Sequence, residues 1–270
     1  MFHHQTPTPR LDAEVLLAQV LKTDRKGLYL SFPNIVPEQE KEILQYLISR
    51  RINGEPVSYI IGRKEFWSLS FKVNPAVMIP RPETETLVET ALKIFSPCSS
   101  PSILEIGTGS GAISIALAAE LPQASIIATD ISFESLTIAK ENASSHGVNS
   151  IQFVEGSLYA PLKGERKIFD LIISNPPYIP TNEIPQLPPG IRDYEPHIAF
   201  DGGPDGLVFY GAIVQKAPDY LNPGGYLLLE VGKGQGSNVA KMMVETGKLS
   251  LPEFINDLSD IERVIKTYRI

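Results

Sequence analysis

Apolar residues recur about every 3.6 residues in two stretches near the start of the chain, residues 11–21 and residues 43–48. This spacing is typical of amphipathic helices, which bury one face. Pro37 precedes the second stretch, and proline is favoured in the first turn of a helix. We therefore expect residues 11–52 to form a small helical unit.

The spacing changes between Phe66 and Val73, where apolar and polar side chains alternate. Alternation predicts a half-buried β-strand, and Asn74-Pro75 directly after it predicts a turn. We interpret residues 66–78 as a hairpin that joins the helical unit to a second domain.

After Thr84, helix-like and strand-like segments alternate along the chain. Helices are expected at residues 87–95, 113–121 and 132–146, and strands at residues 102–106, 125–129, 151–154, 169–174, 226–231 and 263–270. Such alternation is typical of a doubly wound α/β fold, in which helices cover both faces of a parallel sheet and ligands bind at the carboxyl ends of the strands. The proline-rich residues 176–189 form the one long segment expected to be irregular, and such loops are often functional.

The composition is that of an ordinary folded protein, with 43% hydrophobic residues, 20% charged residues and a mean hydropathy of −0.02. No apolar run approaches the ~20 residues of a membrane helix, and the first residues lack the pattern of a signal peptide. The single Cys98 excludes an internal disulfide, and the four histidines lack a metal-ligand spacing. We expect a cytoplasmic protein without a membrane segment or a metal site.

The net charge of −7 is unevenly distributed. Residues 1–75 hold ten Lys and Arg against eight Asp and Glu, whereas residues 76–270 hold fourteen against twenty-three. A protein that grips nucleic acid through phosphate contacts usually has a basic face. The acidic second region therefore argues against a nucleic-acid partner.

A glycine-rich motif, Leu104–Ala112, joins an expected strand to an expected helix, and Asp130 ends the next strand. Glycines at such a turn let the backbone approach a ligand, and the carboxylate can bind both hydroxyls of a ribose. The motif also satisfies the dinucleotide fingerprint, so an NAD-dependent oxidoreductase is an alternative. Glu105 opposes that alternative, because a carboxylate here would repel a pyrophosphate but suits the ammonium and sulfonium charges of S-adenosylmethionine.

A second motif, Asn175-Pro176-Pro177-Tyr178, directly follows the strand expected at residues 169–174. An amide or aromatic amine nitrogen is a poor nucleophile, because its lone pair is delocalised. The side-chain oxygen of Asn175 and the carbonyl of Pro176 can accept both of its hydrogens, orient it toward a methyl group and stabilise the developing positive charge. Tyr178 can then lie against the flat substrate group.

Several further motifs resemble a known family. They are Gly54–Gly62, Glu65-Phe66, Ile79–Glu85, Glu195-Pro196, Gly202–Leu207, and Glu230-Val231-Gly232 followed by Gln235. Together with the loop at Asn175, they resemble the protein-glutamine methyltransferases that modify peptide chain release factors, within the class I S-adenosylmethionine-dependent superfamily. The resemblance runs from about residue 9 to residue 270.

The resemblance implies a fold, a reaction and a partner. The fold is a seven-stranded, mostly parallel, Rossmann-like sheet, with a helical substrate-docking domain at residues 1–63, a β-hairpin linker at 64–82 and a methyltransferase domain at 83–270. The reaction is methylation, by S-adenosylmethionine, of the side-chain amide nitrogen of the glutamine in the Gly-Gly-Gln loop of class I release factors, with S-adenosylhomocysteine as the other product. We expect a monomer that binds neither nucleic acid nor membrane.

The same resemblance implies roles for individual residues. Those expected to contact the donor are Gly107, Thr108, Gly109, Ser110, Gly111, Asp130, Leu158 and Asn175. Those expected to hold the glutamine are Asn175, Pro176, Pro177 and Tyr178, of which Asn175, Pro176 and Tyr178 are the expected catalytic residues.

Two more residues are expected near the cleft between the hairpin and the methyltransferase domain, Phe66 and Arg81. Arg81 is expected either to contact a ligand or to have a structural role in which it pairs with Glu83 or Glu85.

Two other functions are alternatives to glutamine methylation. A DNA amino-methyltransferase shares the Asn-Pro-Pro-Tyr motif but needs a basic groove and a means of extruding the base. A binding protein that kept the cofactor pocket without catalysis would be expected to have a damaged loop at Asn175, and this loop is intact.

Overall fold

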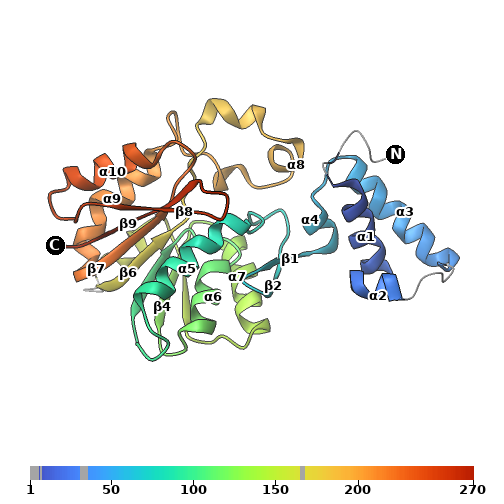
Figure 1. Ribbon diagram of the computed structural model, residues 1–270, viewed down its shortest axis with the longest axis horizontal. Coiled ribbons are helices and arrows are strands. Elements are labelled where there is room, and N and C mark those ends of the chain that lie inside the picture. Colours follow the sequence, from blue (N-terminus) through green and yellow to red (C-terminus); the bar gives the residue numbers. More distant parts are fainter. Residues whose placement is uncertain (1–5, 7, 31–35, 165–167) are drawn as a thin grey trace.

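The computed structural model describes residues 6, 8–30, 36–164 and 168–270. A group of helices near the amino terminus lies at one end of the molecule, and the sheet with its covering helices forms the larger part (Figure 1). Residues 31–35, inside the region expected to be helical, lie outside the described residues. No helix among the described residues combines the length and the apolar character needed to cross a membrane.

The helices of the amino-terminal part are α1 (Pro9–Val20), α2 (Arg25–Leu30), α3 (Glu38–Ile52) and α4 (Val57–Ile61). As expected, Pro37 directly precedes the first residue of α3. A largely buried ion pair joins α3 to α1, with Arg51 Nε 2.7 Å from Asp12 Oδ2. The expected helical unit is thus confirmed for the described residues.

The hairpin that follows consists of β1 (Arg63–Phe66) and β2 (Leu69–Lys72), paired antiparallel. The expectation of one continuous strand from Phe66 to Val73 is wrong, because Trp67 and Ser68 form a two-residue turn with φ of 51° and 57°. Positive φ at both central positions suits a hairpin turn but is costly for residues with side chains. The turn is held by distant side chains, since the Trp67 N–H donates to Glu85 (2.8 Å) and the indole N–H donates to Glu120 (2.9 Å).

Seven strands of the described chain form the main sheet, in the order β5-β4-β3-β6-β7-β9-β8. They are β3 (Ser102–Ile106), β4 (Ser125–Asp130), β5 (Ile151–Glu155), β6 (Phe169–Ser174), β7 (Leu221–Glu230), β8 (Glu253–Asn256) and β9 (Glu262–Tyr268). β9 runs opposite to the other six strands, so the expected mostly parallel sheet is confirmed. The pattern along the chain did not predict β8, a short edge strand whose side chains are mostly exposed.

Helices cover both faces of this sheet (Figure 1). The longer ones are α5 (Glu85–Ile94), α6 (Ala112–Glu120), α7 (Phe133–Ser145), α9 (Val208–Tyr220) and α10 (Gly236–Glu245). The short ones are η1 (Pro82–Thr84), η2 (Ala160–Leu162), η3 (Thr181–Gln186), α8 (Pro189–Arg192) and η4 (His197–Ala199). The proline-rich stretch 176–189 is therefore less irregular than expected, because η3 lies within it and α8 begins at its end.

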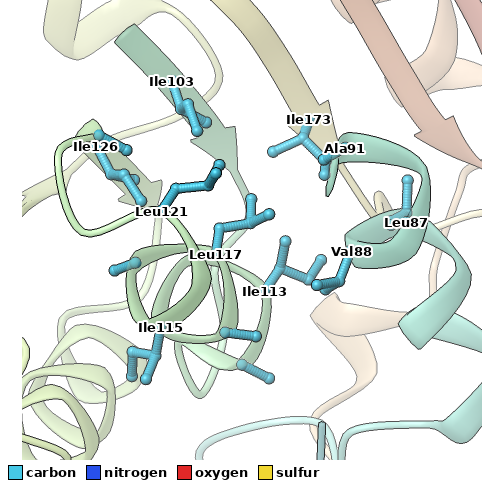
Figure 2. Packing of buried hydrophobic residues seen from close by; sticks show 14 of the residues in the cluster. Leu87, Val88, Ala91, Ile103, Ile113, Ile115, Leu117, Leu121, Ile126 and Ile173 are labelled. Atoms are coloured by element: carbon cyan, nitrogen blue, oxygen red, sulfur yellow. The ribbon is translucent and has the colours of Figure 1, made fainter. Parts of the chain in front are cut away.

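Two apolar layers, one on each face of the sheet, make up most of the core. Successive strand residues alternate between them: Leu171 and Ile173 belong to the first layer and Ile172 to the second. The first layer packs against α5, α6 and the hairpin, and Figure 2 shows the α5 and α6 side chains meeting the strands. The second layer packs against α9 and α10. Burial on both faces explains why the central strands are almost wholly apolar.

Asn142 of α7 fastens the hairpin to the sheet domain. Its side-chain oxygen accepts the Lys72 N–H (2.7 Å), and its amide donates to the carbonyls of Lys72 (3.1 Å) and Ser110 (2.8 Å). The side chain is 1% exposed, so these groups have no water to replace a lost partner. One buried amide therefore couples the hairpin to the glycine-rich turn.

Replacing Asn142 with Ala should lower the free energy of unfolding by about 2–4 kcal/mol, because three hydrogen bonds are lost and their backbone partners stay buried. Urea denaturation measures the change. The matched control, Asn149→Ala, removes an exposed amide just after α7 and should cost less than ~0.5 kcal/mol. Equal losses for the two variants would contradict the fastening role of Asn142.

Candidate active site

The register of three neighbouring strands brings three loops to one edge of the sheet. Ile106 at the end of β3 pairs with Thr129 of β4 on one side and with Ser174 of β6 on the other. The next residues along the chain, Gly107, Asp130 and Asn175, therefore lie at the same level. This edge holds the carboxyl ends of the parallel strands, where doubly wound folds bind ligands.

A cavity opens at this edge, which we call the first cavity. It is lined by the glycine-rich turn, by Asp130 and Ile131, by Gly156–Leu158 and by Asn175–Pro177. Further lining comes from the segment 76–84, which follows the hairpin, and from Pro196, Ile198 and Ala199. Most of these groups are apolar, with a few carboxylates and backbone groups among them, as is usual for a small-molecule site.

The glycine-rich turn is tied to Asp130. The Gly109 N–H donates to Asp130 Oδ2 (2.8 Å), and the Ser132 N–H donates to Asp130 Oδ1 (2.9 Å). These two bonds fix the carboxylate at the cavity wall, while burial raises its pKa. Gly109 has a φ of 55°, which favours glycine, and a Cβ there would meet no atom within 4 Å. The space above Gly109 is therefore open to a ligand.

Glu105 lies beneath this turn and is 1% exposed. Its Oε2 accepts the Thr108 hydroxyl (2.7 Å) and the Ser114 N–H (3.2 Å). Burial raises the pKa of Glu105 to about 7, although both hydrogen bonds oppose the rise. This carboxyl group therefore changes charge near neutral pH at the floor of the first cavity.

Asn175 and Pro176 form a wall between the first cavity and a second one, since both residues line both spaces. The Asn175 amide Nδ2 donates to the Thr84 hydroxyl (3.2 Å). Because Nδ2 is engaged there, the other end of the amide, Oδ1, is left as the acceptor. Neither Pro176 nor Pro177 has an N–H, so this loop offers acceptors rather than backbone donors.

The second cavity has a volume of about 130 Å³. Its lining includes Met78, Arg81, Tyr178 and Glu230 as well as the shared wall. The structural alternative for Arg81 predicted a pairing with Glu83 or Glu85. Arg81 pairs instead with Glu195, at 2.6 Å. Glu195 also accepts the Ile79 N–H (3.0 Å), so it fastens the segment after the hairpin. This pairing depends on the fold, which brings Glu195, 114 residues away in the sequence, to the guanidinium of Arg81.

The loop that carries Tyr178 is held by two of the motifs noted in the sequence. The Gln235 side-chain amide donates to the Tyr178 carbonyl (2.9 Å), and the Gly202 N–H donates to the Ile179 carbonyl (2.9 Å). A Cβ at Gly202 would lie 2.8 Å from the Tyr178 Cα, so a larger residue would displace the loop. Burial raises the pKa of Tyr178 to about 12, which keeps the phenol neutral.

With this geometry established, the chain can be compared with known proteins. Two family models match it: the PrmC N-terminal domain over residues 2–62 and the methyltransferase small domain over residues 83–185. A release factor glutamine methyltransferase from Geobacter sulfurreducens is 46% identical over 238 residues, which cover 88% of this chain and 82% of that protein. One from Xylella fastidiosa is 43% identical over 255 residues, covering 94% and 91%.

The chain belongs to the release factor glutamine methyltransferase family. Among solved structures, a methyltransferase from Pyrococcus furiosus matches with a TM-score of 0.55 at 21% identity, covering 84% of this chain and 98% of that one. This likeness supports the class I methyltransferase fold. The enzyme is an S-adenosylmethionine-dependent methyltransferase, and an NAD-dependent oxidoreductase is no longer an alternative.

The structure brings most of the expected site residues together. The expected donor contacts that line the first cavity are Gly107, Thr108, Gly109, Ser110, Asp130, Leu158 and Asn175. Gly111 instead lies behind the turn, where a Cβ would come within 2.9 Å of Ile115. Pro176 and Pro177 line the first cavity, and Tyr178 lines the second. The contacts of these residues with ligands stay predictions.

One residue expected near the cleft lies outside both cavities, and two residues at the cavities were given no role by the sequence. Phe66 lines neither cavity but is 1% exposed in the core, edge to face with Phe71. Thr84 and Glu230 belong to motifs noted in the sequence but were given no role, although one touches Asn175 and the other lines the second cavity. The residue types alone did not predict a role in the site, because a buried threonine or glutamate acquires such a role only through its neighbours.

The raised pKa of Glu105 predicts a pH dependence of stability. Between pH 4.5 and about 7 the unfolded chain loses the Glu105 proton while the folded chain keeps it, so this group's contribution to stability falls as the pH rises. Glu105→Gln removes the titration. Relative to the parent, this variant should therefore gain about 2–3 kcal/mol of unfolding free energy between pH 5 and pH 8.

Urea unfolding at the two pH values measures this gain. Glu89→Gln, which changes an exposed carboxylate on α5, is the control and should show no such difference. A Glu105→Gln variant whose stability relative to the parent is the same at both pH values would contradict the assignment.

Proposed function

We propose that this enzyme transfers the methyl group of S-adenosylmethionine to the side-chain amide nitrogen of the glutamine in the Gly-Gly-Gln loop of class I peptide chain release factors. The observation that carries the proposal is the wall formed by Asn175 and Pro176. A donor in the first cavity and an acceptor in the second would meet there. The names of the relatives, release factor glutamine methyltransferases, supply the substrate class.

The lining of the first cavity suits the donor in polarity and charge. Asp130 would bind the ribose hydroxyls, Ile131 and Leu158 offer apolar surface for the adenine, and the open backbone at Gly107 and Gly109 leaves room beside them. Glu105 at the floor suits a cationic ligand, because a positive charge favours its ionised form. When bound, the donor supplies an activated methyl group and its own leaving group.

The residues of the wall would supply orientation. Asn175 Oδ1 and the Pro176 carbonyl would accept the two hydrogens of the glutamine amide, which aims the nitrogen at the first cavity and stabilises the positive charge that develops on it. Tyr178 would lie against the flat amide. No base is required before transfer, because the nitrogen becomes acidic only once it carries the methyl group.

The second cavity favours a slim, uncharged acceptor. It is small, and the guanidinium of Arg81 is already paired with Glu195. Glycines beside the glutamine would let the substrate backbone come close to the wall. We propose that the helices within residues 1–63 dock the release factor, that residues 64–82 act as the linker, and that the enzyme works as a cytoplasmic monomer.

A DNA amino-methyltransferase is less well supported. Glu230 lines the second cavity, Glu195 pairs with the Arg81 that lines it, and residues 76–270 carry nine more acidic than basic side chains. Phosphates would be repelled here rather than bound.

The ribose role predicts that Asp130→Ala weakens binding of S-adenosylmethionine by ~1.5–3 kcal/mol, the usual scale of hydrogen bonds to a charged group. Isothermal calorimetry measures the affinity directly. Asp219→Ala, which removes an exposed carboxylate on α9, is the control and should bind as the parent does. An unchanged affinity for Asp130→Ala would refute the role.

The orienting role predicts that Asn175→Ala slows methyl transfer by about a hundredfold or more at saturating donor, the scale of losing one oriented electrostatic partner. Asn182→Ala, an exposed asparagine of η3, serves as the control and should keep the parental rate. If Asn175→Ala stayed within about threefold of the parent, the role would be abandoned.

The substrate is tested by offering methyl-labelled S-adenosylmethionine with three acceptors: unmodified release factor, the same factor with its loop glutamine changed to alanine, and duplex DNA. Peptide mapping by mass spectrometry locates the label. Label confined to the loop glutamine is the expected result. Label on DNA, or equal label on the altered factor, would overturn the proposal.

A further inference from the structure

Glu230 is an unexplained buried carboxylate beside the acceptor cavity. It is the last residue of β7, is 2% exposed and lines the second cavity. Among the described residues, its Oε2 is the one buried side-chain oxygen or nitrogen without a hydrogen-bond partner. A buried carboxylate with an unpartnered oxygen is costly, so its presence calls for a functional reason.

Thr84 lies between this carboxylate and Asn175. The Thr84 side chain is 4% exposed, and its hydroxyl accepts the hydrogen bond from Asn175 Nδ2 (3.2 Å). The same hydroxyl is the neighbour that most strongly opposes the rise in the pKa of Glu230, to about 7, that burial causes. The three side chains therefore form a polar row, buried at Glu230 and Thr84 and half-buried at Asn175, that ends at the wall between the cavities.

A threonine hydroxyl has one proton, so it can donate only one hydrogen bond and must accept the other. If ionised Glu230 takes that proton, the oxygen of Thr84 can only accept from Asn175, so Nδ2 must face Thr84. The acceptor atom Oδ1 then faces the second cavity. If Glu230 is protonated, the hydroxyl is free to donate to Oδ1, and the turned amide would present two donors to a substrate nitrogen that also carries two hydrogens.

We propose that Glu230 and Thr84 are positioning residues that fix the orientation of the Asn175 amide, so that Oδ1 rather than Nδ2 faces the acceptor nitrogen. The predicted effect on methyl transfer rests on the proposed function. The predicted orientation of the Asn175 amide rests only on the row of Glu230, Thr84 and Asn175.

Other charged and titratable groups also face Glu230. Arg263 of β9 favours its ionised form, Glu83 of η1 disfavours it, and the hydroxyl of Tyr178 favours it. The Arg263 guanidinium is shared with Asp257, at 3.3 Å, so it does not fully neutralise Glu230. These groups are present in every variant below, and the differences between variants therefore report on the row.

The kinetic test compares Thr84→Val, which keeps the shape without the hydroxyl, with Thr84→Ser, which restores the hydroxyl, and with Glu230→Gln. At saturating donor, Thr84→Val and Glu230→Gln should lower kcat about 10- to 100-fold, the cost of a misplaced catalytic group, whereas Thr84→Ser should stay within about threefold. Thr90→Val is the matched control, because its buried hydroxyl bonds only within α5, and it should keep the parental kcat.

The pH dependence of kcat provides a readout that a merely structural role would not change. The parental kcat should rise with pH through about 7, as Glu230 ionises, and this step should be absent from Glu230→Gln. At saturating donor, any change in donor affinity caused by the titration of Glu105 does not affect kcat. The proposal would be overturned if Thr84→Val were as fast as Thr84→Ser and if Glu230→Gln kept the pH step in kcat.

A nuclear magnetic resonance titration tests the row without any acceptor. The side-chain amide signals of Asn175 and the carboxyl carbon of Glu230 should titrate with one midpoint in the parent and in Thr84→Ser, and should lose this coupling in Thr84→Val, where the Glu230 midpoint moves up. Independent titration in the parent would refute the row. A coupled titration in an enzyme that does not methylate the release factor would uphold the row and overturn the proposed function instead.

Discussion

The hydrogen-bond register of β4, β3 and β6 is the constraint on which the site depends. Because Ile106 pairs with Thr129 and with Ser174, the three strands end at one level, and the glycine-rich turn, Asp130 and Asn175 meet without any of these loops having to be long. The apolar layers on the two faces fix this register, since a slip of one residue would turn every strand side chain to the opposite face. The first cavity is thus a consequence of how the core packs.

Buried carboxylates give this edge its chemical character. Glu105 lies beneath the first cavity, Asp130 at its wall and Glu230 beside the second, and burial raises the pKa of each. Such groups suit the cationic donor and the neutral, hydrogen-bonding acceptor of the proposed reaction. Under the proposed function, this cost in stability has a use, because Glu105 and Asp130 line the donor cavity and Glu230 lines the acceptor cavity.

Much of this arrangement could be predicted from the sequence, because it depends on local patterns. The period of the apolar residues located α5, α6, α7 and the central strands but not α9 or α10, and the motifs at Gly107 and Asn175 stood at strand ends. β8 was missed because its side chains are mostly exposed, whereas two other failures share one cause, which is dependence on partners far along the chain. The turn at Trp67 is held by Glu85 and Glu120, and Arg81 is paired with Glu195, so no local pattern could show either.

The proposed function requires donor and acceptor to meet across the wall of Asn175 and Pro176. A crystal structure of the enzyme with S-adenosylhomocysteine and an unmodified release factor would show whether they do. We expect the nucleoside beside Asp130 in the first cavity and the loop glutamine in the second, with its amide nitrogen bonded to Asn175 Oδ1 and the Pro176 carbonyl. A glutamine bound elsewhere, or one facing Asn175 Nδ2, would contradict it.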